Sequence, residues 1–205
     1  MKKIFYDIIT IILLILVIIQ APIFYYYTFG LFSFFVVTPY LIFGICLTIW
    51  LLTAVIKNNK SQMTNFHKIG VILVIIIGTL SLSFGENLIE NLDWKFRRSS
   101  REEIVQLVKI NKLKPNVTHN NIICKLHNWN YPPISNGGNE IAIYRADSSN
   151  ITIEFFINRG FLDHYSAFVY TNDVNKIEEI EEHIKHKKGL HVNEKLDKNW
   201  YRVSY

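Results

Sequence analysis

Long apolar runs fill the first half of the chain, whereas the second half alternates between apolar and polar positions. The runs cover about residues 8–26, 31–56 and 69–92. No Asp, Glu, Lys or Arg occurs between Asp7 and Lys57, and each run reaches the roughly 20 residues with which an α-helix crosses a hydrocarbon core of about 30 Å. Since such runs lack the alternation of a barrel strand, the pattern predicts three transmembrane helices in residues 1–92 and a soluble domain in residues 93–205.

The first apolar run has some features of a signal peptide, because Lys2 and Lys3 precede it. A cleavage site needs small residues around the scissile bond. The only small candidate, Ala21, has Ile19 two positions before it and Pro22 directly after it. We therefore expect this run to remain in the protein as an uncleaved helix.

Basic residues beside the helix ends predict the orientation, because the cytoplasmic side of a membrane protein carries more Lys and Arg. The N-terminus and the second connection share one side, and they hold Lys2, Lys3, Lys57, Lys60 and Lys68. The other side holds Lys95, Arg97, Arg98 and Arg101. This small excess, with the first helix usually dominant, predicts a multi-pass protein of the cytoplasmic (inner) membrane. Its N-terminus is expected in the cytoplasm and its C-terminal domain on the extracytoplasmic side.

The composition narrows the class of protein further. Only 19% of the 205 residues are charged, against roughly 25% in soluble domains, and the apolar excess excludes a disordered chain. The two cysteines, Cys46 and Cys124, fall in different domains, so no internal disulfide is expected. Small residues at Gly78, Ser81 and Gly85 predict close packing of the third helix rather than a substrate path.

Two helices are predicted at the start of the soluble domain. Ser100 and Glu103 form a capping-box pattern before an apolar helical face, which predicts a helix over residues 101–112. Thr118 is a second N-cap candidate and predicts a short helix after it. Asp173 can cap a third helix, because apolar residues recur at helical spacing after it.

Strands follow the first two helices and end the chain. Apolar residues alternate over residues 141–143, 151–157 and 165–169, with short turns between them, and residues 200–205 predict a fourth strand. The expected fold is a three-helix transmembrane region followed by an α+β domain of order α-α-β-β-β-α-β. We expect the first two of these helices to cover one apolar face of an antiparallel sheet.

Residues 114–170 show a weak resemblance to the SmpA/OmlA-like domain of outer-membrane assembly lipoproteins. The matching positions are Thr118, Ile122, Leu126, Pro132, Tyr144, Phe155 and Gly160. His127 departs from the pattern, which has Gly there. The resemblance implies two helices beside a three-stranded antiparallel sheet, and an extracytoplasmic module that binds proteins without catalysis.

The soluble domain contains residue types that support metal binding, but their arrangement favours a solvated helix face. His183 and His186 lie three residues apart, with Glu182 and His191 nearby. A zinc site needs three or four converging ligands, whereas lysines crowd this segment. We predict no metal and no cofactor.

Catalytic patterns are equally weak. Asp163, His164 and Ser166 are the residue types of a hydrolase triad, but neighbours in a strand point to opposite faces. The basic cluster at residues 95–101 is expected to meet lipid head groups or to form a solvated linker, and not to bind nucleic acid. The sequence therefore predicts a protein without enzymatic activity.

Aromatic residues in a Pro, Gly and Asn-rich segment, residues 128–139, are the best candidates for a binding surface. The predicted binding residues are Trp129, Tyr131, Pro132, Trp200 and Tyr201. The alternative is that these rings pack beneath their own loop.

These observations favour a membrane-anchored envelope protein whose extracytoplasmic α+β domain binds a protein partner. Its expected partners are the lipid bilayer and that protein. One alternative is a membrane sensor that binds a small ligand in the soluble domain. Another is a membrane immunity protein that blocks a pore-forming toxin through its spans.

Overall fold

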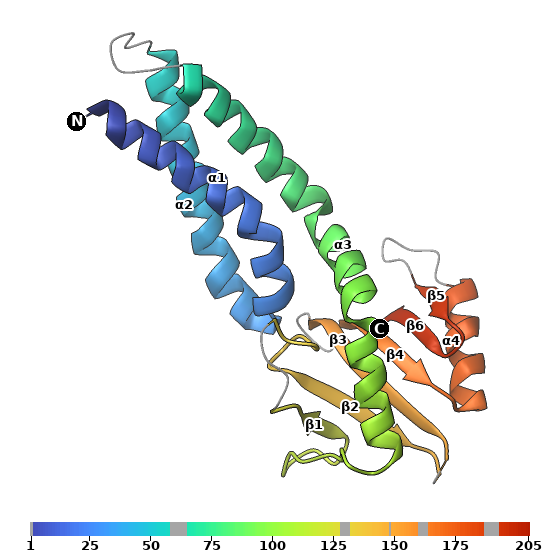
Figure 1. The fold of residues 1–205 in the computed structure, drawn as a ribbon. Helices are drawn as coiled ribbons and strands as arrows, with labels where there is room; N and C mark the ends of the chain where they lie inside the picture. Colours follow the sequence, from blue (N-terminus) through green and yellow to red (C-terminus); the bar gives the residue numbers. More distant parts are fainter. Residues whose placement is uncertain (1, 58–64, 128–131, 148, 160–163, 187–192) are drawn as a thin grey trace. The chain divides into compact units, whose positions relative to one another are not determined.

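The computed structural model describes residues 2–57, 65–127, 132–147, 149–159, 164–186 and 193–205. The chain forms two compact units (Figure 1). The helical unit comprises Met1–Thr28 and Phe32–Asn91, and the sheet unit comprises Phe29–Leu31 and Leu92–Tyr205.

The helical unit is built from long apolar helices. They are α1 (Lys2–Tyr27), α2 (Gly30–Ile56) and the first part of α3 (Asn65–Lys109). All three are long and apolar enough to cross a membrane, which confirms the predicted helices. The helix that we predicted over residues 101–112 is not separate but forms the end of α3. No Gly or Pro lies between Gly85 and Pro115, so nothing in the sequence interrupts the helix there.

Small residues bring α1 and α3 close together in the helical unit. A Cβ atom at Gly85 would lie 2.5 Å from Cβ of Ala21, and one at Gly78 would lie 3.2 Å from Cγ1 of Val17. A Cβ atom at Gly70, about two turns before Gly78 in α3, would meet the Thr10 side chain. The predicted close packing at Gly78 and Gly85 is thereby confirmed, because any larger side chain would push the two helices apart.

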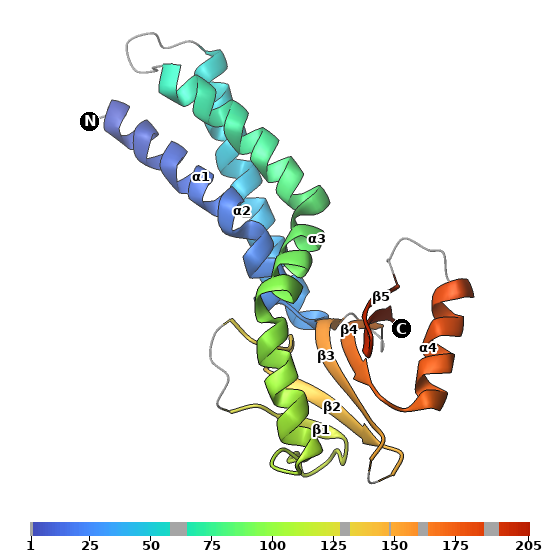
Figure 2. The ribbon, with the colours of Figure 1, turned by 45° about the vertical axis from the view of Figure 1, so that its right-hand side comes forward.

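The sheet unit contains one six-stranded antiparallel sheet of order β1-β2-β3-β4-β6-β5 (Figure 2). Its strands are β1 (Ile123–Lys125), β2 (Glu140–Arg145), β3 (Ile151–Arg159), β4 (Tyr165–Thr171), β5 (Glu194–Asp197) and β6 (Trp200–Ser204). The four strands that alternation predicts are confirmed as β2, β3, β4 and β6. The α+β class is therefore correct, although two further strands change the predicted order.

The predicted short helix after Thr118 is wrong, because this segment forms a turn followed by β1. Val117 and Asn120 make an isolated bridge. The side chain of Asn116 then accepts a hydrogen bond from the Lys125 backbone nitrogen at 2.8 Å and donates one to the Lys125 carbonyl at 3.0 Å. Pairing of β1 with β2 thus replaces the local helical preference with backbone bonds to a distant segment.

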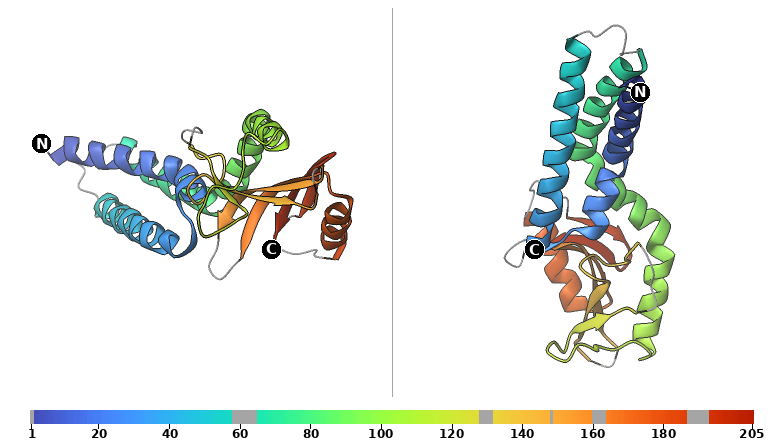
Figure 3. Two further views of the ribbon diagram at one scale, coloured as in Figure 1. Left: turned by 90° about the horizontal axis from the view of Figure 1, so that it is seen from below. Right: turned by 90° about the vertical axis from the view of Figure 1, so that its left-hand side faces the viewer.

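Two helices cover opposite faces of the sheet (Figure 3), whereas the sequence predicted cover for one face by the helices at residues 101–112 and after Thr118. The end of α3 covers the face of Phe155 and Phe168, where Ile104, Val105 and Val108 are fully buried. α4 (Val174–His186) covers the other face. At the start of α4, the backbone nitrogen of Asn175 donates a hydrogen bond to Oδ1 of Asp173 at 3.0 Å. This bond confirms Asp173 as the predicted N-cap.

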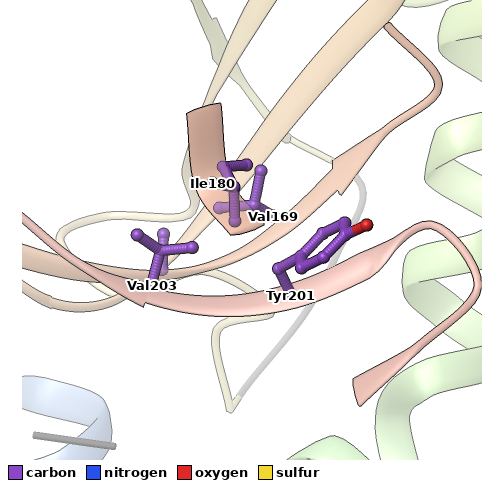
Figure 4. Close-up of a cluster of buried hydrophobic side chains, with 5 residues drawn as sticks. Val169, Ile180, Tyr201 and Val203 are labelled. Carbon is purple, nitrogen blue, oxygen red and sulfur yellow. The ribbon is translucent and has the colours of Figure 1, made fainter. Parts of the chain in front are cut away.

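The α4 side of the sheet has a compact apolar core (Figure 4). Its buried members are Ala167, Val169, Ile180, Tyr201 and Val203. Ile180 belongs to α4, and the strand residues are every second position of β4 and β6, as the pleat requires. The helical periodicity of α4 and the alternation of these strands therefore specify the same interface.

Candidate functional site

The five predicted binding residues do not form one exposed surface in the described part of the structure. Trp129 and Tyr131 lie outside the described residues. Pro132, directly after them, is exposed. Trp200 and Tyr201 are only 2% and 0% exposed, so they lie in the interior and do not extend an exposed surface around Pro132.

Trp200 and Tyr201 are neighbours in β6 and therefore point to opposite faces of the sheet. Trp200 packs beneath α3, with its ring centre 5.2 Å from that of Trp94, and its indole nitrogen donates to Oε1 of Glu102 at 2.7 Å. Tyr201 lies beneath α4, where its hydroxyl donates to Oε1 of Glu181 at 3.2 Å. Both rings are core residues that join a helix to the sheet.

Arg97, near the start of the sheet unit, holds the segment that follows the aromatic residues. Its guanidinium donates to the carbonyl oxygens of Pro132 at 2.5 Å and Pro133 at 2.7 Å. The same group donates to Oδ1 of Asp93 at 3.2 Å. Proline has no backbone N–H, so this stretch of backbone can be fixed only through its carbonyl oxygens. A charged donor such as Arg97 makes strong hydrogen bonds to them.

Arg101, one turn further along α3, continues this network into the core. Its side chain is 2% exposed, pairs with Oδ2 of Asp93, and donates to the carbonyl of Ile134 at 3.3 Å. The guanidinium carbon lies 4.6 Å from the ring centre of Phe168, within cation–π range. Asp93, itself 3% exposed, thus joins two arginines to the Pro132–Ile134 segment.

The basic cluster at residues 95–101 therefore has a different role from the one predicted. Arg97 and Arg101 bind within the sheet unit, and Arg98 pairs with Asp197 of β5. The prediction of a solvated linker or a lipid-binding patch is wrong for Arg97 and Arg101, whose side chains are 19% and 2% exposed. For Arg98, whose side chain is 43% exposed, it stays a prediction. Local sequence shows the charges of such a cluster but not the carbonyl and carboxylate partners that lie far along the chain.

The rest of the predicted loop folds back onto β3. Oδ1 of Asn139 accepts from the Ile134 nitrogen at 2.7 Å, and the side-chain nitrogen of Asn136 donates to the Ile157 carbonyl at 2.9 Å. Gly137 and Gly138 have φ values of 76° and 95°, which glycine adopts without strain. The Pro132–Asn139 segment is therefore fixed at both ends by side chains.

A buried carboxyl group that the sequence analysis does not predict lies at the centre of β3. The strand register places Ala142 of β2 and Val169 of β4 beside Glu154. The hydroxyl of Tyr165 donates to Oε2 of Glu154 at 3.0 Å, and the hydroxyl of Tyr205 donates to Oε1 at 2.9 Å. Glu154 is 3% exposed.

The electrostatic setting of Glu154 favours its protonated form. Burial raises the pKa of the Glu154 carboxyl, and the two tyrosine hydrogen bonds and the charge of Lys176 oppose this effect only in part, while Glu179 adds to it. Burial also raises the pKa values of Tyr165 and Tyr205, so both hydroxyls keep their protons. The cluster can therefore bind and release a proton inside the sheet unit at a higher pH than an exposed glutamate does.

The alternation of apolar and polar residues in β3 is the only sequence pattern that concerns Glu154, and it predicts an exposed side chain. Ile153 and Phe155 face α3, which places Glu154 on the face that a single helical layer would leave to solvent. Only the cover supplied by α4 and by tyrosines from two other segments buries it.

The other candidates for chemistry do not converge. No group of three or more potential metal ligands occurs within the described ranges. Nε2 of His183 lies 3.2 Å from the backbone carbonyl of Ser204, while His191 and Asp163 fall outside those ranges. Cys124 is fully buried, and burial raises the pKa of its thiol, which disfavours the reactive thiolate.

Comparison of the chain with protein-family models, curated proteins and solved structures finds no match. The likeness to the SmpA/OmlA-like domain therefore stays a prediction. Its expected second helix, after Thr118, is replaced by a turn and β1.

Proposed function

We propose that this chain is a non-enzymatic, membrane-anchored envelope protein whose sheet unit binds a protein partner. Its three apolar helices support anchoring in the bilayer. The excess of lysines at the N-terminus and in the α2–α3 connection supports an inner-membrane topology with the N-terminus in the cytoplasm and the sheet unit outside.

The observation that carries partner binding is the pair of hydrogen bonds from Arg97 to the carbonyls of Pro132 and Pro133. These bonds fix the backbone of Pro132 and Pro133, which follow Trp129 and Tyr131 in the sequence. A partner that binds next to a fixed segment orders less of the chain on association, so less affinity is lost to entropy. Aromatic residues in such a place are the side chains that most often dominate binding energy.

The sheet edges favour this loop over pairing of a partner strand with the sheet. Asn116 occupies the backbone groups of Lys125 on the outer side of β1. At the other edge, β5 has four residues, and Lys195 pairs with Glu181 of α4. Short, charged or covered edges discourage strand addition.

Affinity purification of the full-length protein from its own membranes tests the proposal. Trp129→Ala should lower recovery of one specific protein at least 10-fold, since loss of a binding hot spot costs about 2 kcal/mol or more. Val174→Ala is the matched control, because Val174 is an exposed apolar residue of α4, and it should leave recovery unchanged. Equal recovery of every protein by Trp129→Ala and wild type would contradict the proposal.

A sensor is the second candidate, and one observation favours it. α3 supplies buried residues to both cores, Val71 and Val74 in the helical unit and Ile104 and Val108 in the sheet unit. If the protein is a sensor, Gly78→Leu should alter hydrogen exchange of the amides at residues 104–108. Unchanged exchange there would reject the sensor.

A further inference from the structure

The helical unit contains a partly open apolar cavity of about 260 Å³ that is lined by α1, α2 and α3. Its walls are mainly aliphatic and include Leu13, Val17, Leu41, Ile45, Val74 and Leu82. Apart from its chain neighbours and the nearby backbone of α2, no atom of the described residues lies within 4 Å of the position that a Cβ atom at Gly44 would take. This volume lies just below the roughly 300–1,000 Å³ of typical small-molecule sites.

Most polar groups in the cavity wall are already satisfied within the helices. The hydroxyl of Tyr40 donates to the Leu16 carbonyl. The hydroxyls of Thr48 and Thr79 donate to carbonyls one turn earlier in their own helices, at 2.7 and 2.8 Å. These groups therefore have no remaining donor for a ligand.

Gln20 is the polar residue of the cavity wall whose donor is not satisfied within the helices. It is 4% exposed, it lines the cavity, and its amide nitrogen has no hydrogen-bond partner among the residues that the structure describes. An amide donor left unpaired in an apolar setting is energetically unfavourable.

We propose that this cavity binds an uncharged, lipid-soluble molecule that presents a carbonyl oxygen to the side-chain amide of Gln20. The ligand is uncharged because no Asp, Glu, Lys, Arg or His of the described residues lines the cavity, and an unpaired charge inside a membrane is energetically costly. It carries an acceptor because the unpaired atom of Gln20 is a donor. A partner helix, about 10–12 Å across, does not suit a space of this size.

The carbonyl could come from the ester of a membrane lipid or from a free lipophile. Three photoactivatable probes separate these sources in full-length protein reconstituted in lipid nanodiscs. The first is a long-chain methyl ketone with a diazirine in its chain, and the second is the matching hydrocarbon. The third is a phosphatidylcholine with the same diazirine in one acyl chain.

The ketone should label cavity residues at least five-fold more than the hydrocarbon, as mapped by mass spectrometry. Gln20→Leu should reduce ketone labelling to the hydrocarbon level, while Gly44→Leu, which fills the space, should reduce both. Phe43→Leu is the control, because Phe43 is exposed on α2, and it should change neither. Labelling by phosphatidylcholine at the ketone level identifies a lipid ester as the ligand, and weak labelling identifies a free lipophile.

Equal labelling of the wild-type cavity by ketone and hydrocarbon would show ordinary lipid contact only and would overturn the proposal. A competition experiment needs no variant, so it covers the case in which Gln20→Leu does not fold. Excess unlabelled methyl ketone should suppress ketone labelling, whereas the alkane of equal length should not. Equal suppression by both would also overturn it. Neither result depends on partner binding by the sheet unit.

Discussion

Each face of the sheet buries an ionisable side chain, Arg101 beneath α3 and Glu154 beneath α4, but the two side chains have different partners. Beneath α3, Arg101 is paired with the carboxylate of Asp93 and stacked near Phe168. Beneath α4, Glu154 receives two tyrosine hydroxyls, and none of the ion pairs in the described part of the chain includes it. On the α3 face, opposite charges form an ion pair. On the α4 face, the charge of Glu154 depends on whether its carboxyl group is protonated. The comparison therefore predicts that pH acts mainly through the α4 face.

Arg101→Met should give the largest loss of stability. Removing one partner of a buried ion pair costs about 3–5 kcal/mol, and Arg97, whose guanidinium lies 3.2 Å from Asp93 and is more exposed than that of Arg101, compensates the Asp93 charge only in part. Hydrogen exchange of the β4 amides in the full-length protein measures the free energy of unfolding of the sheet unit. The control is Arg98→Met, because the Arg98–Asp197 pair is about 40% exposed and should contribute less than about 1 kcal/mol. Equal losses in the two variants would show that burial of the Arg101 pair is not decisive.

Tyr165→Phe should have the next largest effect. It removes one donor to the buried carboxylate, and a hydrogen bond to a charged group contributes about 1.5–3 kcal/mol. The loss should be larger at pH 8 than at pH 4, where a protonated Glu154 depends less on that donor. Tyr170→Phe, on the other face, is the control, and its effect should be the same at both pH values. A Tyr165→Phe effect that does not change with pH would argue against an ionised Glu154.

Glu154→Gln should change the pH dependence of stability more than stability itself. The folded-state pKa of Glu154 is raised above its ordinary value of 4.5, so its favourable contribution is complete below about pH 4.5. That contribution is lost as pH rises through the folded-state pKa. The variant should therefore gain stability relative to wild type as pH increases.

Glu181→Gln gives the opposite sign and serves as the control. Hydrogen bonds from Lys195 and Tyr201 lower the pKa of Glu181, so its contribution is present above about pH 4.5 and is lost on acidification. Hydrogen exchange of β3 and β4 amides between pH 4 and pH 8 compares the two variants. Parallel pH curves for wild type and Glu154→Gln would contradict the assignment of pH sensitivity to Glu154.

Arg97→Gln should have the smallest effect on stability, about 1 kcal/mol, because Arg101 still neutralises Asp93. It should nevertheless lower recovery of the protein partner several-fold, since the Pro132 and Pro133 carbonyls lose their charged donor. Lys95→Gln is the control, as Lys95 is exposed on the same turn. If Arg97→Gln and Lys95→Gln recover the partner equally, fixation of this loop does not matter for binding.

Part of the candidate site could be predicted from the sequence. The Pro, Gly and Asn-rich segment marks a loop, and the structure shows Pro132 exposed there. Trp200 and Tyr201 could also have been recognised as unable to share one surface, because neighbours in a strand point to opposite faces. The roles of Arg97 and Glu154 could not be predicted in this way. Their partners lie 35, 36, 11 and 51 residues away, and periodicity contains no information about such pairs.

The sequence by itself determined the three long apolar helices, the four alternating strands and α4. Each of these is specified by burial that repeats with the period of its own backbone, so a local pattern is sufficient. The tertiary structure alone decided that the segment after Thr118 becomes a turn and β1, that β5 forms, and that α3 and α4 take opposite faces. It also decided which charges are paired and which carboxyl is left to bind a proton. These outcomes depend on backbone and side-chain bonds between distant segments, whose free energy exceeds the small local preferences that a sequence pattern records.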